Sequence, residues 1–402
     1  LENSLERTLG VPLFQEQLMQ MSMDVGGFTG RDADELRRAM GAKRSEAAMA
    51  RLGDRFLAGA AQRGVPADVA EEIFRKIAAF ADYGFPESHA MSFANLVYHS
   101  AWLKRHHHAA FTAGLLRAQP MGFYSPQSLL ADARRHGVRV LPVCVNRSGA
   151  RADLERDPDS EGGFAIRLGL DSVRGLGKEA AEAVVEVRGE DEFSSAGDLA
   201  QRTGLGKAAL EGLATAGALS CFGLDRRRAL WVAGGQAGAS PATLPGTSGP
   251  VSAPVLPDMD AFEDTLAQLW ATGVTVDGYP TEVLREQLTA RGYGSTADAL
   301  AAEPRTRVTI AGIVTHRQRP ATAEGLTFFN LEDEAGMLNV VCTAGLLRRY
   351  RRIALTKNVL AVTGIIQRAE TAESTDAVVV SLYADRLTPI RTQLNVRSRD
   401  FR

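Results

Sequence analysis

The sequence predicts a multidomain α+β protein, in which a wholly helical region precedes a domain of tandem helical hairpins and a C-terminal β-barrel. Three observations predict this order. Apolar residues recur at helical spacing through much of residues 1–136, the sequence Gly-Leu-Gly-Lys occurs twice near the middle of the chain, and strand-like apolar segments dominate after residue 304.

The first region is expected to be helical almost throughout. In the segment PADVAEEIFRKIAAFADYGF, four apolar residues lie three or four positions apart, namely Val69, Ile73, Ile77 and Phe80. This spacing predicts one amphipathic helix that ends at Gly84. The next helix is expected to have Ser88 as its N-cap and to bend near the histidines at 106–108. We assign residues 1–137 to this helical domain.

The repeated Gly-Leu-Gly-Lys sequence predicts a tandem helix-hairpin-helix domain over residues 138–233. In each copy the glycines allow a tight turn that leaves backbone N–H groups at a helix N-terminus, where a phosphate can bind. One such turn also ends many ordinary helices, but two copies favour binding of the sugar-phosphate backbone. The candidate DNA contacts are Gly175, Gly177 and Lys178, and Gly204, Gly206 and Lys207. Two short strands, at 138–148 and 163–173, are expected before the first copy, with a polar turn between them.

The last 169 residues are expected to form four further segments. Residues 234–258 are rich in Gly, Pro, Ser and Ala and predict a flexible linker, and 259–303 predict a helical connector. Over 304–390 the order is three strands, a short helix and two strands, which is the order of an OB-fold. The polar residues 391–402 are expected to form a tail.

Charge is distributed unevenly along the chain, although its formal net value is only −2. Residues 141–304 carry 14 basic and 24 acidic side chains, whereas 305–402 carry 15 basic and 9 acidic ones. The basic excess at the C-terminal end is compatible with a polyanionic partner, and equally with a solvated basic surface.

The composition is that of a globular protein, with 45% hydrophobic and 23% charged residues in 402. No apolar run approaches the ~20 residues that cross a bilayer, so we expect no membrane contact and a cytoplasmic location. Three scattered cysteines, at 144, 221 and 342, are expected to be reduced core residues. The first residue is Leu1 rather than Met, which suggests a fragment.

Three segments of the N-terminal quarter resemble the fingers region of bacterial C-family DNA polymerases, the polymerase III alpha-subunit group. They are GVPLFQEQLMQMS, LRRAMGAKRSE and YGFPESHAMSFANLVYHSAWLKRHHHAAF. Tandem helix-hairpin-helix followed by OB-fold is also the order of that family's C-terminal half. VLPVCVNRS, GLDSVRGLG and the ending SRDFR are most similar to its error-prone, damage-inducible branch. The resemblance implies a DNA polymerase of translesion synthesis and DNA repair in the SOS response.

The family's catalytic centre has no counterpart in this sequence. Family polymerases hold two Mg²⁺ ions with three palm aspartates that precede the matching segment, and two-metal nucleotidyl transfer needs them. The candidate pairs here are Asp32/Asp34, Asp157/Asp159 and Asp258/Asp260. The first lies at an expected helix start and the others in expected loops, so we predict that none binds a metal. The intact protein is expected to be a nucleotidyltransferase, and this chain alone to be inactive.

The resemblance implies a nucleotide contact in the fingers. Arg37, Arg38, Lys43 and Arg44 would meet the incoming deoxynucleoside triphosphate, because guanidinium groups pair with phosphate oxygens. The alternative is a solvated helix face. Ser88 and His89 also lie in a family motif, and a helix cap explains them better than a phosphate or template contact.

Two other groups of residues suggest ligands. Three consecutive helical residues point about 100° apart, so His106, His107 and His108 are not expected to share one metal ion. In the OB-like domain Phe328 and Phe329, with Arg317 and Arg319, are candidates for single-stranded template. Adjacent strand residues face opposite ways, so only one phenylalanine can stack on a base.

The resemblance also implies partners. Primer-template DNA is expected, as are mutasome proteins that include an inactive Y-family-like polymerase. The sliding-clamp motif of replicative relatives is not evident, since only LPDMDAFEDTLAQLW lies between the two domains, and direct clamp contact is doubtful. The alternative function is a non-enzymatic DNA-binding scaffold that recruits repair or replication partners. A palm domain encoded upstream of Leu1 would distinguish the polymerase from the scaffold.

Overall fold

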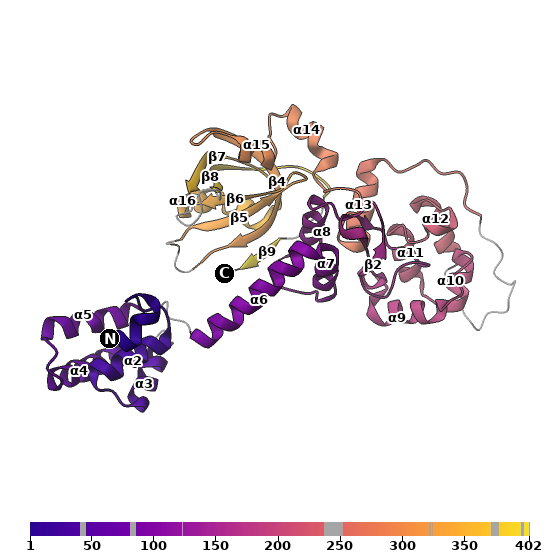
Figure 1. Cartoon of the computed structure of the whole chain (residues 1–402). Coiled ribbons are helices and arrows are strands. Elements are labelled where there is room, and N and C mark those ends of the chain that lie inside the picture. Colours follow the sequence, from indigo (N-terminus) through magenta and orange to yellow (C-terminus); the bar gives the residue numbers. More distant parts are fainter. Residues whose placement is uncertain are drawn as a thin grey trace. The chain divides into compact units, whose positions relative to one another are not determined.

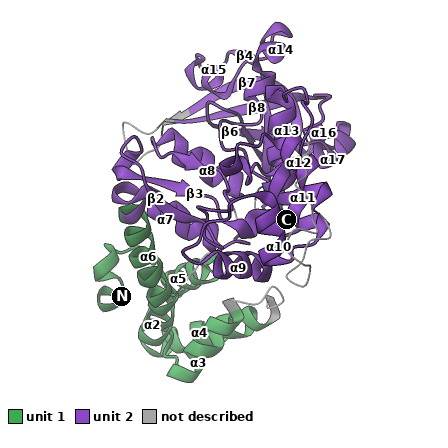
Figure 2. Ribbon diagram, turned by 90° about the vertical axis from the view of Figure 1, so that its right-hand side faces the viewer, with its two compact units in different colours: residues 1–102 green, residues 103–402 purple. Residues whose placement is uncertain are grey.

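The computed structural model (Figure 1) describes the chain apart from residues 41–45, 81–85, 123, 237–251, 321–322, 324, 371–377, 395–397 and 402. Lys43, Arg44 and Gly84 therefore lie outside the described residues. The chain divides into two compact units, Leu1–Trp102 and Leu103–Arg402 (Figure 2).

The first unit is helical, as predicted. Its elements are α1 (Glu2–Leu5), η1 (Glu6–Thr8), α2 (Gln15–Gly26), α3 (Gly30–Met40), α4 (Glu46–Gln62), α5 (Ala67–Ala79) and most of α6 (Glu87–His106). Its core centres on Phe56, which contacts the rings of Phe28 and Phe74. A Cβ at Gly59 would lie 1.9 Å from the carbonyl oxygen of Gly26, so two glycines let α2 and α4 approach closely.

Two details of the predicted helices differ. On α5 Ile73 and Ile77 are buried, but Val69 is 44% exposed and the buried stripe continues through Ala70 instead. Helix α6 begins at Glu87, so Ser88 lies inside it and does not cap it. The predicted bend is confirmed, because His107 has φ −138° and ψ 50° and separates α6 from α7 (His108–Arg117).

The second unit begins with helices and a small sheet. Helix α8 (Pro126–Arg135) follows α7, and β1 (Val140–Leu141), β2 (Asp153–Arg156) and β3 (Phe164–Arg167) form a sheet in the order β1-β3-β2. Strand β2 lies in the segment predicted as a polar turn. Its residues are at least partly exposed, so they lack the buried apolar face that marks a strand in a sequence.

Helices then form the hairpin domain, which includes η4 (Leu170–Ser172), α9 (Gly177–Arg188), α10 (Ala196–Thr203), α11 (Lys207–Thr215) and α12 (Arg226–Gly235). In the first copy only the single turn η4 precedes the Gly-Leu-Gly sequence, whereas in the second copy α10 precedes it. Leu170, Leu199 and Leu213 belong to one core that these helices share with β3.

The connector contains α13 (Ala261–Thr272), η6 (Glu282–Leu284), α14 (Arg285–Ala290) and α15 (Thr296–Ala301). Asp260 caps α13 by accepting a hydrogen bond from the amide of Glu263 at 2.7 Å. Ala299 of α15 packs into the barrel core.

The C-terminal region is an OB-fold barrel, as predicted. Its strands are β4 (Arg307–Gln318), β5 (Thr327–Glu332), β6 (Met337–Cys342), β7 (Val359–Glu370) and β8 (Val378–Pro389), with α16 (Ala344–Arg349) and α17 (Arg351–Thr356) after β6. The order is β5-β6-β8-β7-β4, and β5 also pairs with β4, which closes the barrel. The predicted tail contains a further strand, β9 (Arg399–Phe401), which runs parallel to β4.

The cysteines are free. Cys144 and Cys342 are buried as expected, but Cys221 is exposed. None of the helices in the described ranges is long and apolar enough to cross a membrane.

Candidate nucleic-acid interface

The second Gly-Leu-Gly turn leaves the backbone at the start of α11 open to solvent. Gly204 ends α10 in the left-handed conformation (φ 62°), and its amide donates to the carbonyl of Ala200. Gly206 is the N-cap of α11, and a Cβ there would meet nothing within 4 Å. Among the described residues no acceptor is bonded to the amides of Gly206, Lys207 and Ala208. These exposed donors point from a helix N-terminus, where an anion is stabilised.

In the first turn the second glycine, Gly177, also has open space around its Cβ position, as Gly206 has in the second turn. Gly175 and Gly177 both have positive φ, 85° and 73°, which residues with a Cβ rarely adopt. Gly177 has open space around its Cβ position, but at Gly175 a Cβ would approach the carbonyl oxygen of Ala208 at 3.1 Å. Gly175 therefore permits close packing, and Gly177 is the glycine that faces open space.

The two turns lie beside each other. Gly175 contacts Ala208, which is the second residue of α11, and a Cβ at Gly212 would lie 2.2 Å from the carbonyl oxygen of Arg174. The amide of Arg174 donates to the carbonyl of Ala271 at 2.7 Å, which anchors the first turn on α13. The structure thus brings residues 174–178 and 206–208 together, although they are about 30 positions apart in the sequence.

A lysine follows each turn on the surface. Lys178 lies 3.8 Å from Glu182 and Lys207 lies 3.7 Å from Glu211, each one helical turn away. The lysine side chains are 59% and 66% exposed. Exposed ion pairs of this kind contribute only about 0–1 kcal/mol, so a phosphate can replace either glutamate.

Beside the first turn lies a cleft of about 810 Å³ whose lining includes Ser172, Arg174, Trp270, Tyr279 and Thr315. The guanidinium of Arg174 stacks on the ring of Trp270, 4.7 Å from its centroid. Half of Trp270 is exposed, so a stacked cation and an open aromatic edge line the cleft.

In the barrel the candidate pair of phenylalanines is divided between two faces. Phe329 is 1% exposed and packs inside the barrel, and Phe328 is partly exposed on the outer face. Phe328 pairs with Val341 of β6 and with Gln318 of β4, next to the exposed Arg319.

Arg317 is not available to a template, which corrects the prediction. Its side chain is 5% exposed and lies over the ring of Phe329. It donates to the carbonyls of Ala354 and Lys357 at 2.7 and 2.6 Å, and it pairs with Asp400 of β9 at 3.2 Å. Because it faces the same side of β4 as the barrel core, Arg317 fastens α17 and β9 to the barrel.

An additional basic surface lies on α16 and α17, and we call it the arginine group. Its members are exposed, and no acidic side chain of the described residues lies within ion-pair distance of them; they are Arg348, Arg349, Arg351 and Arg352. The sequence LLRRYRRIAL contains this signal, but the helical spacing alone does not reveal whether acidic neighbours neutralise it.

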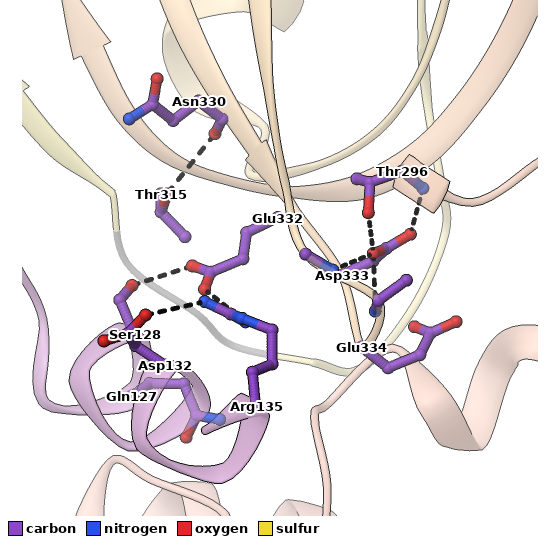
Figure 3. Close-up of polar contacts among 12 residues, drawn as sticks. Gln127, Ser128, Asp132, Arg135, Thr296, Thr315, Asn330, Glu332, Asp333 and Glu334 are labelled. Atoms are coloured by element: carbon purple, nitrogen blue, oxygen red, sulfur yellow. Dashed lines mark hydrogen bonds and ion pairs between the residues drawn. The ribbon is translucent and has the colours of Figure 1, made fainter. Parts of the chain in front are cut away.

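Buried polar contacts join the barrel to α8 (Figure 3). Ser128 donates to Glu332 at 2.8 Å, and Arg135 lies 3.8 Å from the other carboxylate oxygen of Glu332. Burial raises the pKa of Glu332, while Ser128 and Arg135 oppose that rise. The adjacent Asp333 accepts hydrogen bonds from the amide and hydroxyl of Thr296 at the start of α15. No sequence pattern indicated these carboxylates, because their roles depend on contacts with residues 204 positions away for Glu332 and 37 positions away for Asp333.

The candidate residues of the N-terminal helical region form ion pairs with neighbouring side chains. Arg37 and Arg38 both pair with Asp34, at 2.8 and 2.7 Å. Asp32 accepts from the amide and hydroxyl of Thr29 and pairs with Arg55 at 2.8 Å. His89 lies against Phe93 on α6.

The remaining aspartate pairs also have other partners. Asp157 and Asp159 both pair with Arg139, at 3.0 and 3.4 Å. Asp260 caps α13, as described above. None of the three pairs is arranged as two free carboxylates around one ion.

Three family models match parts of the chain. The finger domain of the bacterial DNA polymerase III alpha subunit matches residues 1–64, a helix-hairpin-helix motif matches 137–229, and an OB-fold nucleic acid binding domain matches 308–390. Residues 1–64 are thus similar to a domain of that polymerase subunit, and the other two models describe a DNA-binding motif and a nucleic-acid-binding domain.

Over its whole length the chain is similar to error-prone DNA polymerases. It is 51% identical to that of Mycobacterium bovis over 99% of this chain and 36% of the relative. It is 52% identical to that of Corynebacterium efficiens over 100% of this chain and 36% of the relative. The chain thus spans about a third of the length of these relatives.

Two solved structures are similar to part of the chain at low sequence identity. Asparaginyl-tRNA synthetase from Pyrococcus horikoshii is 17% identical over 22% of this chain and 20% of that chain, with a TM-score of 0.18. An OBody bound to hen egg-white lysozyme is 17% identical over 23% of this chain and 88% of that chain, with a TM-score of 0.19.

Proposed function

We propose that this chain holds primer-template DNA by its sugar-phosphate backbone, without reading base sequence. The observation that carries this proposal is the pair of neighbouring Gly-Leu-Gly turns, whose second glycines, Gly177 and Gly206, face open space. Each turn opens a helix, and Lys178 and Lys207 follow with exposed side chains. Amides and lysines of this kind bind phosphates, which carry no sequence information.

The OB-fold would take the single-stranded template. Phe328 offers a partly exposed ring on the outer face of the barrel, and Arg319 is exposed beside it. Stacking on one such ring contributes ~1–3 kcal/mol per base. The arginine group supplies positive charge on the same domain, and it accounts for part of the basic excess of residues 305–402.

In the fingers the deoxynucleoside triphosphate would meet Arg37, Arg38, Lys43 and Arg44. Arg37 and Arg38 share the single carboxylate of Asp34 and are 46% and 75% exposed. A triphosphate carries more negative charge than one carboxylate and can compete for both guanidinium groups. Lys43 and Arg44 lie outside the described residues.

The intact protein is, on this proposal, an error-prone DNA polymerase that extends primers across damaged template in damage-induced mutagenesis. The support is the name of its relatives and their similarity over the whole of this chain, which spans about a third of their length. In such an enzyme two Mg²⁺ ions stabilise the attacking and leaving oxygens. The aspartate pairs described here do not fit that role, because ion pairs or helix caps engage members of each pair. Cytoplasmic location and mutasome partners belong to the same proposal.

The test uses the whole chain with fluorescent primer-template duplexes of unrelated sequence. We expect equal affinities by anisotropy, and no primer extension when Mg²⁺ and deoxynucleoside triphosphates are added. Affinities that differ more than about tenfold between duplexes would contradict backbone binding. A sequence-specific protein loses ~1–3 kcal/mol of binding free energy for each mismatched base pair, whereas a backbone-binding protein does not. Primer extension by the pure chain would contradict the absence of a catalytic centre.

A further inference from the structure

Two histidines and an aspartate of the second unit converge on one point. His108 is the first residue of α7, Asp132 lies on α8, and His136 is the residue that ends α8. One ligand atom from each of the three lies within 4.8 Å of the others. His106 and His107 do not belong to this cluster, so the sequence-based rejection of a site made of three consecutive histidines does not apply to it.

The central nitrogen of this cluster is buried without a hydrogen bond. His108 is 8% exposed, and its Nε2 atom makes no hydrogen bond to any described residue. It lies 3.4 Å from Oδ2 of Asp132, and its ring lies 4.4 Å from the ring of His136. A buried polar atom that makes no hydrogen bond costs about 1–3 kcal/mol, so a ligand that bonds to it is stabilising.

The donor set suits a divalent transition metal. Two imidazole nitrogens and one carboxylate oxygen are the ligands that Zn²⁺ takes at about 2.0–2.2 Å. The Nδ1 atom of His136 lies 2.8 Å from the backbone carbonyl oxygen of Asp132, a contact that orients the ring as in many metal sites.

We propose that His108, Asp132 and His136 bind one zinc-class divalent cation. Three protein ligands leave a fourth position for water, which the half-exposed His136 makes accessible. The ion would fasten the first residue of α7 to α8. The bound ion would also influence the contact between α8 and the barrel, because Asp132 lies 3.9 Å from Arg135, and Arg135 lies 3.8 Å from the buried Glu332 of the barrel.

One cation already competes for the carboxylate. The ammonium of Lys104 lies 2.8 Å from Oδ2 of Asp132, and its side chain is 45% exposed. Binding of the metal requires Lys104 to move into solvent. The charge of Lys104 is therefore expected to weaken metal binding, which separates this site from chance binding by surface histidines.

The experiment measures Zn²⁺ binding to the full chain by calorimetry and the visible spectrum of the Co²⁺ form. We expect one ion per chain and the intense absorption of tetrahedral cobalt. H108Q and H136Q should each weaken binding by tenfold or more. K104Q should strengthen it, and the matched control H106Q/H107Q should leave it unchanged.

Several results would overturn the site. They are the absence of stoichiometric binding to the wild-type chain, unchanged binding in H136Q, or loss of binding in the H106Q/H107Q control. Because His136 is half exposed, H136Q is expected to fold even if replacement of the buried His108 disrupts α7.

Discussion

At the scale of single residues, Phe328 and Phe329 have opposite roles although they are adjacent. The alternation of a strand predicts that one ring faces the core and the other the surface. It does not predict which, because both residues have the same side chain. Register decides the question: Phe329 pairs with Arg317 on the inner side of β4, and Phe328 pairs with Gln318.

Alanine at the two positions should therefore give different phenotypes. F329A should lower the free energy of unfolding of the barrel by ~3–5 kcal/mol, since it leaves a cavity beside Arg317. F328A should leave stability nearly unchanged and weaken binding of single-stranded DNA by about 1–3 kcal/mol. Chemical denaturation and anisotropy titrations measure the two effects. Equal binding by folded F328A and wild-type chains would exclude this ring as a stacking platform.

At the scale of elements, the contact between the two Gly-Leu-Gly turns depends on Gly212. G212A places a Cβ 2.2 Å from the carbonyl oxygen of Arg174, a backbone atom that cannot move alone. We expect a loss of about 1–3 kcal/mol in unfolding free energy, as for other overpacked positions. The matched control G206A meets no atom within 4 Å and should be nearly neutral. Thermal unfolding compares them, and equal melting temperatures would contradict the close packing.

The contact between barrel and α8 should make stability depend on pH through Glu332. Burial gives this carboxyl a higher pKa in the folded chain than in the unfolded one. The folded state therefore loses relative stability as the pH rises above about 4.3, the ordinary value for Glu. E332Q does not titrate, so its stability relative to wild type should increase from pH 4 to pH 7.

Glu334 supplies the control for this pH dependence. It is partly buried, and hydrogen bonds from Arg285 and Thr281 together outweigh that burial and lower its pKa. E334Q should therefore lose stability relative to wild type over the same pH range. Melting temperatures at several pH values test both variants, and parallel curves for wild type and E332Q would show that Glu332 does not titrate differently on folding.

At the scale of the whole molecule, the sequence predicted the order of helices, hairpins and OB-fold because each depends on local periodicity. It could not predict strand β2, because the residues of this strand lack a buried face. It could not predict β9 either, because β9 depends on the ion pair between Asp400 and Arg317 of β4, which are far apart in the sequence. The same limit applies to Arg317 as a candidate site residue. A charged residue in a strand normally faces water, and the burial of Arg317 is explained by its carbonyl acceptors on and after α17 together with Asp400.

The most direct test of the central claim is the salt dependence of DNA binding. For the wild-type chain, log affinity should fall linearly with log salt, because bound phosphates release counterions. K178E/K207E should bind more weakly and with a slope smaller by about 1–2, since two phosphate contacts are lost. K76E is the control, because the Lys76 side chain is 58% exposed and also pairs with a glutamate one helical turn away, Glu72, outside the turns. An unchanged slope in K178E/K207E, or an equal loss in K76E, would contradict phosphate binding at the Gly-Leu-Gly turns.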